Sequence, residues 1–246
     1  MLLSEQSALV TGASDRLGAQ IARTLHQNGA NLIIHYRQSQ AKAEQLADEL
    51  NAQRADSARA VAANLAQMHD IENLAQQASS TFGGLHLLVN NASSFYPTPF
   101  GEIDESAFDD LFASNFKAPL FLAQACLESL RENGGSIVNL LDIYATLPLA
   151  QHSVYCSAKA ANQMLVKTMA LELAPAIRVN GIAPGAMLWP QGSEPSAARL
   201  QQLRDEVPLQ RLGGAQVIAD TVLFLATNDY ITGEVIRVDG GRLLSE

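Results

Sequence analysis

Short apolar runs alternate with longer amphipathic segments along this chain. Apolar runs bounded by turn residues are typical of buried strands, and apolar positions three and four apart are typical of helices. The pattern predicts strands at 7–11, 31–36, 59–63, 85–90, 136–141, 178–182 and 234–238. It predicts helices at about 17–28, 41–53, 68–82, 104–131 with one break, and 153–175, and short helices from about 197 and 216.

Apolar strands that are each followed by a helix are typical of a parallel sheet with helices on both faces. The alternation continues over all 246 residues without a linker or a repeat. We therefore predict the α/β class, with one Rossmann-type doubly wound sheet of about seven strands in a single domain, 1–246. Ligands of such sheets bind beyond the carboxyl ends of the strands. A Gly- and Pro-rich segment at about 184–206 is the expected substrate loop.

Composition excludes several classes of protein. A net charge of −9 argues against nucleic-acid binding, which needs a basic face. No run of 18 apolar residues and no basic leader is present, so we expect a cytoplasmic protein without a membrane partner. The two cysteines, Cys126 and Cys156, have no metal-binding spacing, nor do the five histidines. We expect reduced thiols and no metal.

The segment after the first predicted strand has the features of a dinucleotide-binding turn. Gly12 permits a tight turn and Gly18 permits close helix packing, with Ser14, Arg16 and Leu17 between them. The helix that follows would offer its N-terminal N–H groups to a pyrophosphate. The alternative is an ordinary turn between a strand and a helix.

The end of the second predicted strand indicates which dinucleotide binds. Proteins selective for NAD usually carry an acidic residue here, but this chain reads Tyr36-Arg37-Gln38-Ser39. Arg16, Arg37 and a serine hydroxyl would suit the 2′-phosphate of NADP(H), which arginine binds through paired hydrogen bonds. The alternative is that Arg37 is a solvated surface residue.

Tyr155 and Lys159 are four residues apart in the helix predicted at 153–175, so their side chains share one face. A nearby ammonium favours the phenolate, and we expect it to lower the pKa of Tyr155 and make this residue a proton donor. Asp142 precedes Tyr155 by thirteen residues. Its charge would raise the pKa of Tyr155, so the three groups should titrate together.

Separate, correctly ordered motifs resemble the short-chain dehydrogenase/reductase family. They are the Gly12–Gly18 turn, Asn90-Asn91-Ala92, Asn115, Tyr155-x-x-x-Lys159, Pro184-Gly185 and Val238-Asp239-Gly240-Gly241. The resemblance implies that Lys159 also binds the nicotinamide ribose and that Asn115 holds a water leading from Lys159 to solvent. It adds Asn64, Leu65, Asn91, Ala92, Ser93, Pro184 and Gly185 to the expected cofactor site.

Three positions depart from the common pattern of that family. Arg16 stands where a third glycine is usual, Asp142 where a serine is usual, and Asn64 where an aspartate commonly holds the adenine. The first two, with the loop 90–99, look like the pteridine reductase branch. That resemblance implies NADPH-dependent reduction of a pterin or folate by a homotetramer. Asn64 is not explained by it and is expected to keep an adenine hydrogen bond.

Asp142 is the residue that most restricts the class of substrate. An ionised carboxylate cannot donate to a carbonyl oxygen and would repel a developing oxyanion, which argues against simple ketone reduction. Beside a basic ring nitrogen, it would serve as a proton relay or as an acceptor for ring N–H and amino groups. The alternative is a turn aspartate outside the site.

A flat heteroaromatic ring could stack between Phe95 and the nicotinamide, with Ser93 and Arg16 at the ring edge. Leu188 and Trp189 are expected to cover the substrate. The alternatives are a loop-packing role for Phe95 and an interface role for Trp189 and Tyr230.

Two other functions stay open at this point. One is a carbonyl or 3-oxoacyl thioester reductase of the same family. The other is a non-catalytic NADP-binding sensor, against which the intact Tyr155–Lys159 pair argues.

Overall fold

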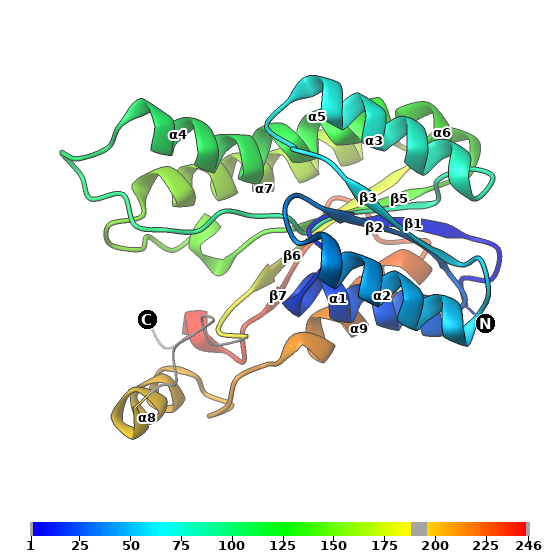
Figure 1. The fold of residues 1–246 in the computed structure, drawn as a ribbon. Coiled ribbons are helices and arrows are strands. Elements are labelled where there is room, and N and C mark those ends of the chain that lie inside the picture. The colour runs from blue at the N-terminus through cyan, green and yellow to red at the C-terminus, as the bar shows by residue number, and fades with distance from the viewer. Residues whose placement is uncertain (1, 188–195, 245–246) are drawn as a thin grey trace.

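A computed structural model describes residues 2–187 and 196–244. Seven parallel strands form one sheet in the order β3-β2-β1-β4-β5-β6-β7, which confirms the predicted doubly wound α/β fold (Figure 1). The strands are β1 (Ser7–Val10), β2 (Asn31–Tyr36), β3 (Ala58–Ala62), β4 (Leu87–Asn90), β5 (Ser136–Leu140), β6 (Arg178–Pro184) and β7 (Val235–Val238).

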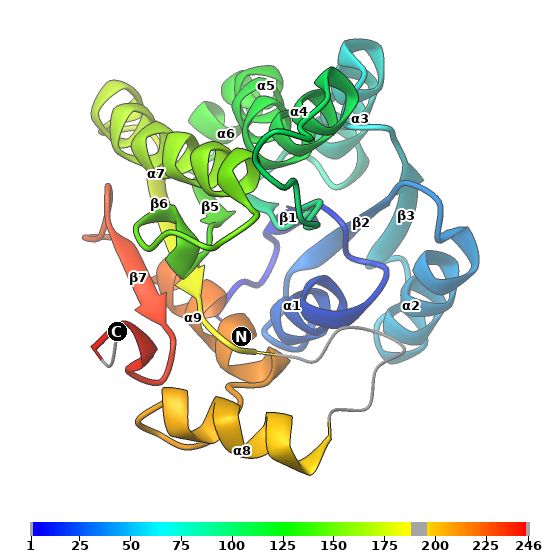
Figure 2. The ribbon, with the colours of Figure 1, turned by 90° about the vertical axis from the view of Figure 1, so that its left-hand side faces the viewer.

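Helices cover both faces of this sheet (Figures 1 and 2). One face carries α1 (Arg16–Gln27), α2 (Gln40–Gln53) and α9 (Ala215–Thr227). The other carries α3 (Met68–Thr81), α4 (Glu105–Phe112), α5 (Ala118–Ala125), α6 (Leu127–Glu132) and α7 (Ser153–Leu173). A further helix, α8 (Ala197–Glu206), stands apart from both layers, below the ends of β6 and β7 in Figure 1.

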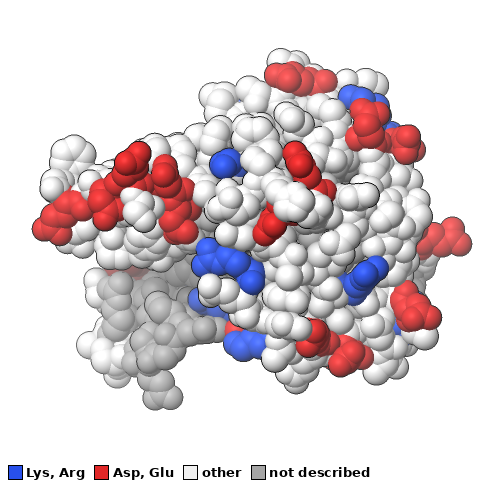
Figure 3. Space-filling model, turned by 45° about the horizontal axis from the view of Figure 1, so that its top comes forward, with Lys and Arg blue, Asp and Glu red and all other residues white. Residues whose placement is uncertain are grey.

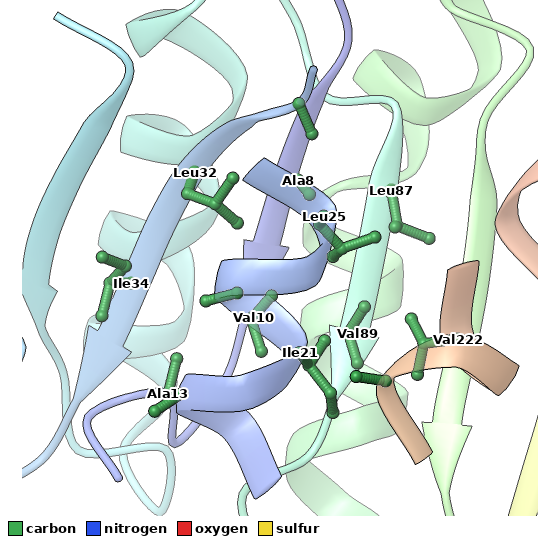
Figure 4. Packing of buried hydrophobic residues seen from close by; sticks show 14 of the residues in the cluster. Ala8, Val10, Ala13, Ile21, Leu25, Leu32, Ile34, Leu87, Val89 and Val222 are labelled. Atoms are coloured by element: carbon green, nitrogen blue, oxygen red, sulfur yellow. The ribbon is translucent and has the colours of Figure 1, made fainter. Parts of the chain in front are cut away.

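The core is two apolar layers separated by the sheet. On one side, Ile21 and Leu25 of α1 pack over Val10 of β1, and Val222 reaches the same layer from α9 (Figure 4). All four side chains are completely buried. Strands that are apolar on both faces need such a double cover, so burial of these side chains stabilises the layered arrangement.

The helical region predicted at 104–131 is interrupted twice, not once. A wide π-helical turn, η1 (Ala113–Lys117), separates α4 from α5, and Cys126 separates α5 from α6. Pro119 has no N–H, so the Asn115 carbonyl four residues earlier lacks its usual helical donor. The side chain of Asn162 in α7 donates to that carbonyl instead, at 2.8 Å.

The strand order indicates where a ligand-binding crevice lies in this fold. Successive connections run outward from β1 in one direction and from β4 in the other, and these two strands are neighbours. A crevice forms at such a switch point, beyond the carboxyl ends of the strands. Figure 2 views the molecule with α8 crossing below β6 and the C-terminal turn.

Among the described residues, no helix combines the length and apolar character needed to span a membrane.

Candidate active site

A cavity of about 830 Å³ lies at this crevice. Most of the residues predicted to bind cofactor or substrate line it, although they come from loops far apart in the sequence. They are Gly12, Arg16, Leu17, Gly18, Arg37, Ser39, Asn64, Leu65, Asn91, Ala92, Ser93, Phe95, Asp142, Tyr155, Lys159, Pro184 and Gly185.

Four predicted residues do not line the cavity. Ser14 and Gln38 lie in its flanking loops, and Tyr36 packs against the apolar core between the sheet and α1. Asn115 is buried beneath the site, 1% exposed. Leu188 and Trp189 fall outside the described residues.

The glycine turn has the close contacts that only glycine permits. Gly12 has a φ of +60°, and a Cβ there would lie 3.1 Å from the Cα of Ala92. A Cβ on Gly18 would lie 2.7 Å from Nδ2 of Asn91. The turn therefore packs against the end of β4 and leads into the N-terminus of α1, whose first N–H groups favour an anion.

Buried His35 also fixes this turn, and the sequence pattern did not single it out. Its Nδ1 accepts from Gly12 N and its Nε2 donates to Ala63 O, both at 3.0 Å. Burial lowers its pKa to about 4, so the imidazole is neutral near pH 7. A neutral ring can accept at one nitrogen and donate at the other, as both bonds require.

Basic side chains gather where the adenosine half of a dinucleotide would lie. Arg16, Arg37 and Lys42 line this part of the cavity together with the Ser39 hydroxyl. Arg37 is half exposed, with Nη1 3.9 Å from the Asp110 carboxylate. Figure 3 shows a small group of basic side chains near the middle of this face and a larger acidic group toward the α4 end. The local chemistry fits a 2′-phosphate.

The three groups singled out around Tyr155 are brought together. The Tyr155 hydroxyl donates to Oδ2 of Asp142 at 2.7 Å. Oδ1 of Asp142 accepts from Tyr144 N at 3.0 Å, so Asp142 caps its turn and also contacts the tyrosine. Lys159 Nζ donates to Leu140 O at 2.8 Å and lies 5.8 Å from the Tyr155 ring centroid.

Burial dominates the electrostatics of this group. It raises the pKa of Tyr155 far above its ordinary value, and the Asp142 charge raises it further. The pKa of Tyr155 is therefore raised and not lowered as the spacing to Lys159 predicted, whereas the raising effect of Asp142 agrees with our prediction. Burial also raises the pKa of Asp142 and lowers that of Lys159 to about 8.

Phe95 forms part of an aromatic cluster beside the tyrosine. Its ring stacks on His152 with centroids 4.7 Å apart and meets Tyr155 edge-on at 4.8 Å. Phe95 lines the cavity and His152 does not, so the histidine packs behind the ring. Phe95 is 55% exposed and leaves room for a flat ligand.

Several residues that line the cavity were not named individually by the sequence analysis. Tyr144, Met187, Leu203 and Arg242 come from a short turn, a loop, α8 and the C-terminal turn. Met187 and Leu203 lie within the 184–206 segment predicted as the substrate loop, whereas Tyr144 and Arg242 belong to no motif that the sequence analysis identified. Among the described residues, no group of three or more potential ligand side chains is placed to hold a metal ion.

Comparisons with known proteins agree with this geometry. A family model described as Enoyl-(Acyl carrier protein) reductase matches residues 1–242. The chain therefore belongs to the short-chain dehydrogenase/reductase family.

Individual relatives span almost the whole chain. Pteridine reductase 1 of Leishmania tarentolae is 39% identical, covering 97% of this chain and 96% of its own. The 3-oxoacyl-(acyl-carrier-protein) reductase of Staphylococcus epidermidis is 35% identical, covering 96% and 98%. A blue fluorescent protein from a metagenomic library, solved in complex with NADPH, superimposes with a TM-score of 0.92 at 30% identity, covering 98% of this chain and 99% of that one.

Proposed function

We propose that this protein is an NADPH-dependent reductase of pterins, acting on dihydropterins such as dihydrobiopterin or on dihydrofolate. The observation that supports this most is the 2.7 Å hydrogen bond from the Tyr155 hydroxyl to the buried Asp142 carboxylate. A carboxylate there repels a developing oxyanion but accepts from the N–H and amino groups of a pterin. The 39% identity to a pteridine reductase agrees with it.

The cavity residues fit NADPH, which would supply the hydride. The Gly12–Gly18 turn and the start of α1 would hold the pyrophosphate, and Arg16, Arg37 and Ser39 the 2′-phosphate. Asn64 and Leu65 would contact the adenine, and the nicotinamide half would lie against Asn91, Ala92, Ser93, Pro184 and Gly185. All of these residues line the cavity. We propose that Lys159 binds the nicotinamide ribose.

The proton that accompanies the hydride comes from the protein. Tyr155 donates it to a ring nitrogen of the C=N bond being reduced. Asp142, which is ionised at rest, then takes up a proton from solvent and passes it to the Tyr155 phenolate through their hydrogen bond. Burial raises the pKa of Asp142 above its ordinary value, which favours this proton uptake. Phe95 would stack on the substrate ring and hold it parallel to the nicotinamide.

A 3-oxoacyl thioester reductase is the second candidate. The observation in its favour is 35% identity along the full chain to a reductase of that kind, together with the same Tyr155–Lys159 pair. Asp142 distinguishes the two candidate functions, because reduction of a carbonyl substrate needs a hydrogen-bond donor at position 142.

The test is NADPH oxidation with dihydrobiopterin, dihydrofolate and an acetoacetyl thioester side by side. We expect turnover of at least one pterin substrate and little of the thioester. Asp142→Asn should keep the side chain's size and lose pterin reduction, while Asp142→Ser should gain thioester reduction. Absence of pterin turnover with wild type would refute the proposal, and thioester turnover alone would establish the second candidate.

We also propose a homotetramer, on the family resemblance and on exposed apolar side chains of α9 and the segment that follows it. Phe224 is 48% exposed and Tyr230 is 97% exposed in the single chain.

A further inference from the structure

Arg242 lines the cavity at its substrate end, beside Tyr144 and Leu203. It lies in the C-terminal turn Arg242–Leu244, which is separated from the end of β7 by Asp239, Gly240 and Gly241. The side chain crosses from this turn toward two other segments, the end of α8 and the turn that carries Asp142.

The Arg242 side chain contacts both of these segments. Its Nη2 donates to Oε2 of Glu206, the last residue of α8, at 2.9 Å. Its guanidinium carbon lies 5.9 Å from the centroid of the Tyr144 ring. The ion pair is largely shielded from solvent, with 15% of the arginine side chain and 28% of the glutamate side chain exposed. Shielded pairs interact more strongly than surface pairs, because water screens them less.

The backbone around the pair is fixed as well. The Asp239 carboxylate accepts from Gly241 N at 2.9 Å and from Leu243 N at 3.0 Å, which shapes the C-terminal turn. Leu209 N, just after α8, donates to Gly240 O at 3.1 Å. Glu206 and Arg242 are therefore held opposite each other by the fold.

The ion pair lies within electrostatic reach of Asp142. The charged and titratable groups acting on that carboxylate are Tyr155 and Lys159 of α7 and Arg242 of the C-terminal turn. Strand β6 also packs on the Asp142 turn, but its one charged residue, Arg178, donates to carbonyls of α9 instead. Of Tyr155, Lys159 and Arg242, only Arg242 forms an ion pair with a residue of α8, Glu206.

We propose that Arg242 is a positioning residue of the active site, which ties α8 to the Asp142 turn through Glu206 and sets the charge that the Asp142 carboxylate experiences. Leu203, three residues before Glu206 on α8, lines the cavity. A substrate that displaces α8 would therefore change the pairing of Arg242 and, through it, the proton affinity of Asp142. This role rests on the proposed function in that Asp142 takes part in the reaction.

The two partners of the ion pair should have opposite effects. In Arg242→Met the cation is lost, so the pKa of Asp142 rises. In Glu206→Gln the cation loses its counter-charge, so the pKa of Asp142 falls. A purely structural link would shift the pKa in the same direction in both variants, because both break the same bridge.

The pKa of Asp142 is measured by NMR titration of isotope-labelled aspartate carboxyl groups, with the Asp142 signal assigned by its loss in Asp142→Asn. This readout needs no substrate, so it stays valid if the protein does not reduce pterins. The pH dependence of kcat/KM, for whichever substrate wild type reduces, should shift in the same directions.

Asp205→Asn is the matched control. Asp205 is the neighbouring acidic residue on α8, and it is exposed and accepts from Gln201 rather than from Arg242. It should leave the Asp142 pKa at the wild-type value, and Arg242→Lys, which keeps the charge, should stay closer to wild type than Arg242→Met. Shifts in one direction for both Arg242→Met and Glu206→Gln, or no shift in either, would overturn the proposal. If Arg242→Met does not fold, an unchanged pKa in Glu206→Gln is sufficient to overturn it.

Discussion

At the scale of single residues, the site depends on buried groups whose ionisation the fold controls. Tyr155 is 3% exposed and its hydroxyl faces a carboxylate instead of an ammonium. Because Lys159 lies four residues after Tyr155 in the sequence, we predicted that it lowers the pKa of the tyrosine. In the structure, burial and the Asp142 charge outweigh it and raise the pKa of Tyr155.

Tyr155→Phe removes the proposed proton donor and little else, since the ring and its packing remain. We expect kcat for the accepted substrate to fall by roughly two to four orders of magnitude, the usual contribution of a positioned acid. NADPH affinity, measured by fluorescence titration, should change less than about twofold. An equal loss of both would show that α7 itself had moved.

Arg37→Ala tests the cofactor end. A charge-assisted bond to a 2′-phosphate contributes about 1.5–3 kcal/mol, so NADPH binding should weaken roughly 10-fold to 100-fold. NADH binding should hardly change, because that cofactor lacks the phosphate. Arg59→Ala removes an exposed arginine of β3 outside the cavity and is the control. An unchanged preference would assign Arg37 to the solvated surface.

The depressed pKa of Lys159 predicts a pH-dependent stability. Its pKa is about 8 in the folded protein against 10.5 ordinarily. Between these values the unfolded chain holds a proton that the native state lacks, so the free energy of unfolding rises with pH. Relative to Lys159→Met, wild type should gain roughly 1 kcal/mol per pH unit above about pH 8. Urea unfolding at pH 7 and pH 9.5 measures this, and parallel curves for the two proteins would contradict it.

At the scale of elements, a chain of buried asparagines joins the sheet to the catalytic helix. Asn90 donates to Asn139 at 2.8 Å, Asn139 to Asn162 at 2.7 Å, and Asn162 to the Asn115 carbonyl at 2.8 Å. Asn162 lies three residues after Lys159 in α7. The network therefore anchors the helix face that carries Tyr155 and Lys159. The family resemblance implied that Asn115 holds a water leading from Lys159 to solvent. In the structure the main-chain carbonyl of Asn115 accepts from the Asn162 side-chain amide.

Asn162→Leu tests this network. It leaves the Asn139 amide and the Asn115 carbonyl without their partner in a buried site, which should cost about 2–4 kcal/mol of stability. Gln163→Leu, the neighbouring residue on the same helix, should cost well under 1 kcal/mol. Urea denaturation measures both. Equal losses would mean that the network contributes nothing beyond helix packing.

At the scale of the whole molecule, the layered fold assembles the cavity from segments that span residues 12 to 242. The same fold leaves Phe224 and Tyr230 exposed on one side. Apolar side chains that a single chain does not bury are candidates for contacts between copies.

Phe224→Glu should reduce a homotetramer to a smaller assembly, because a charge at a buried interface is costly. Light scattering coupled to size-exclusion chromatography measures the mass. Leu2→Glu places the same charge on another exposed apolar residue, 65% exposed, and should leave the mass at four chains. A wild-type protein that elutes as a monomer would contradict the proposed tetramer directly.

The sequence by itself determined the order of strands and helices along the chain, the parallel sheet and the end of the sheet at which the cavity lies. These follow from local periodicity and from the rule that ligands bind at strand carboxyl ends. It also identified the residues of the glycine turn and the Asp142, Tyr155 and Lys159 group, because each lies in a motif or departs from one at a defined spacing.

Only the tertiary structure decided the rest. Burial set the direction of the pKa shifts, and desolvation depends on neighbours from several elements that no local pattern records. His35, the Asn162 network and the Glu206–Arg242 pair emerged for the same reason: each joins segments distant in sequence. Arg242 lies 100 positions after Asp142, and only the folded chain brings its charge to bear on that carboxylate.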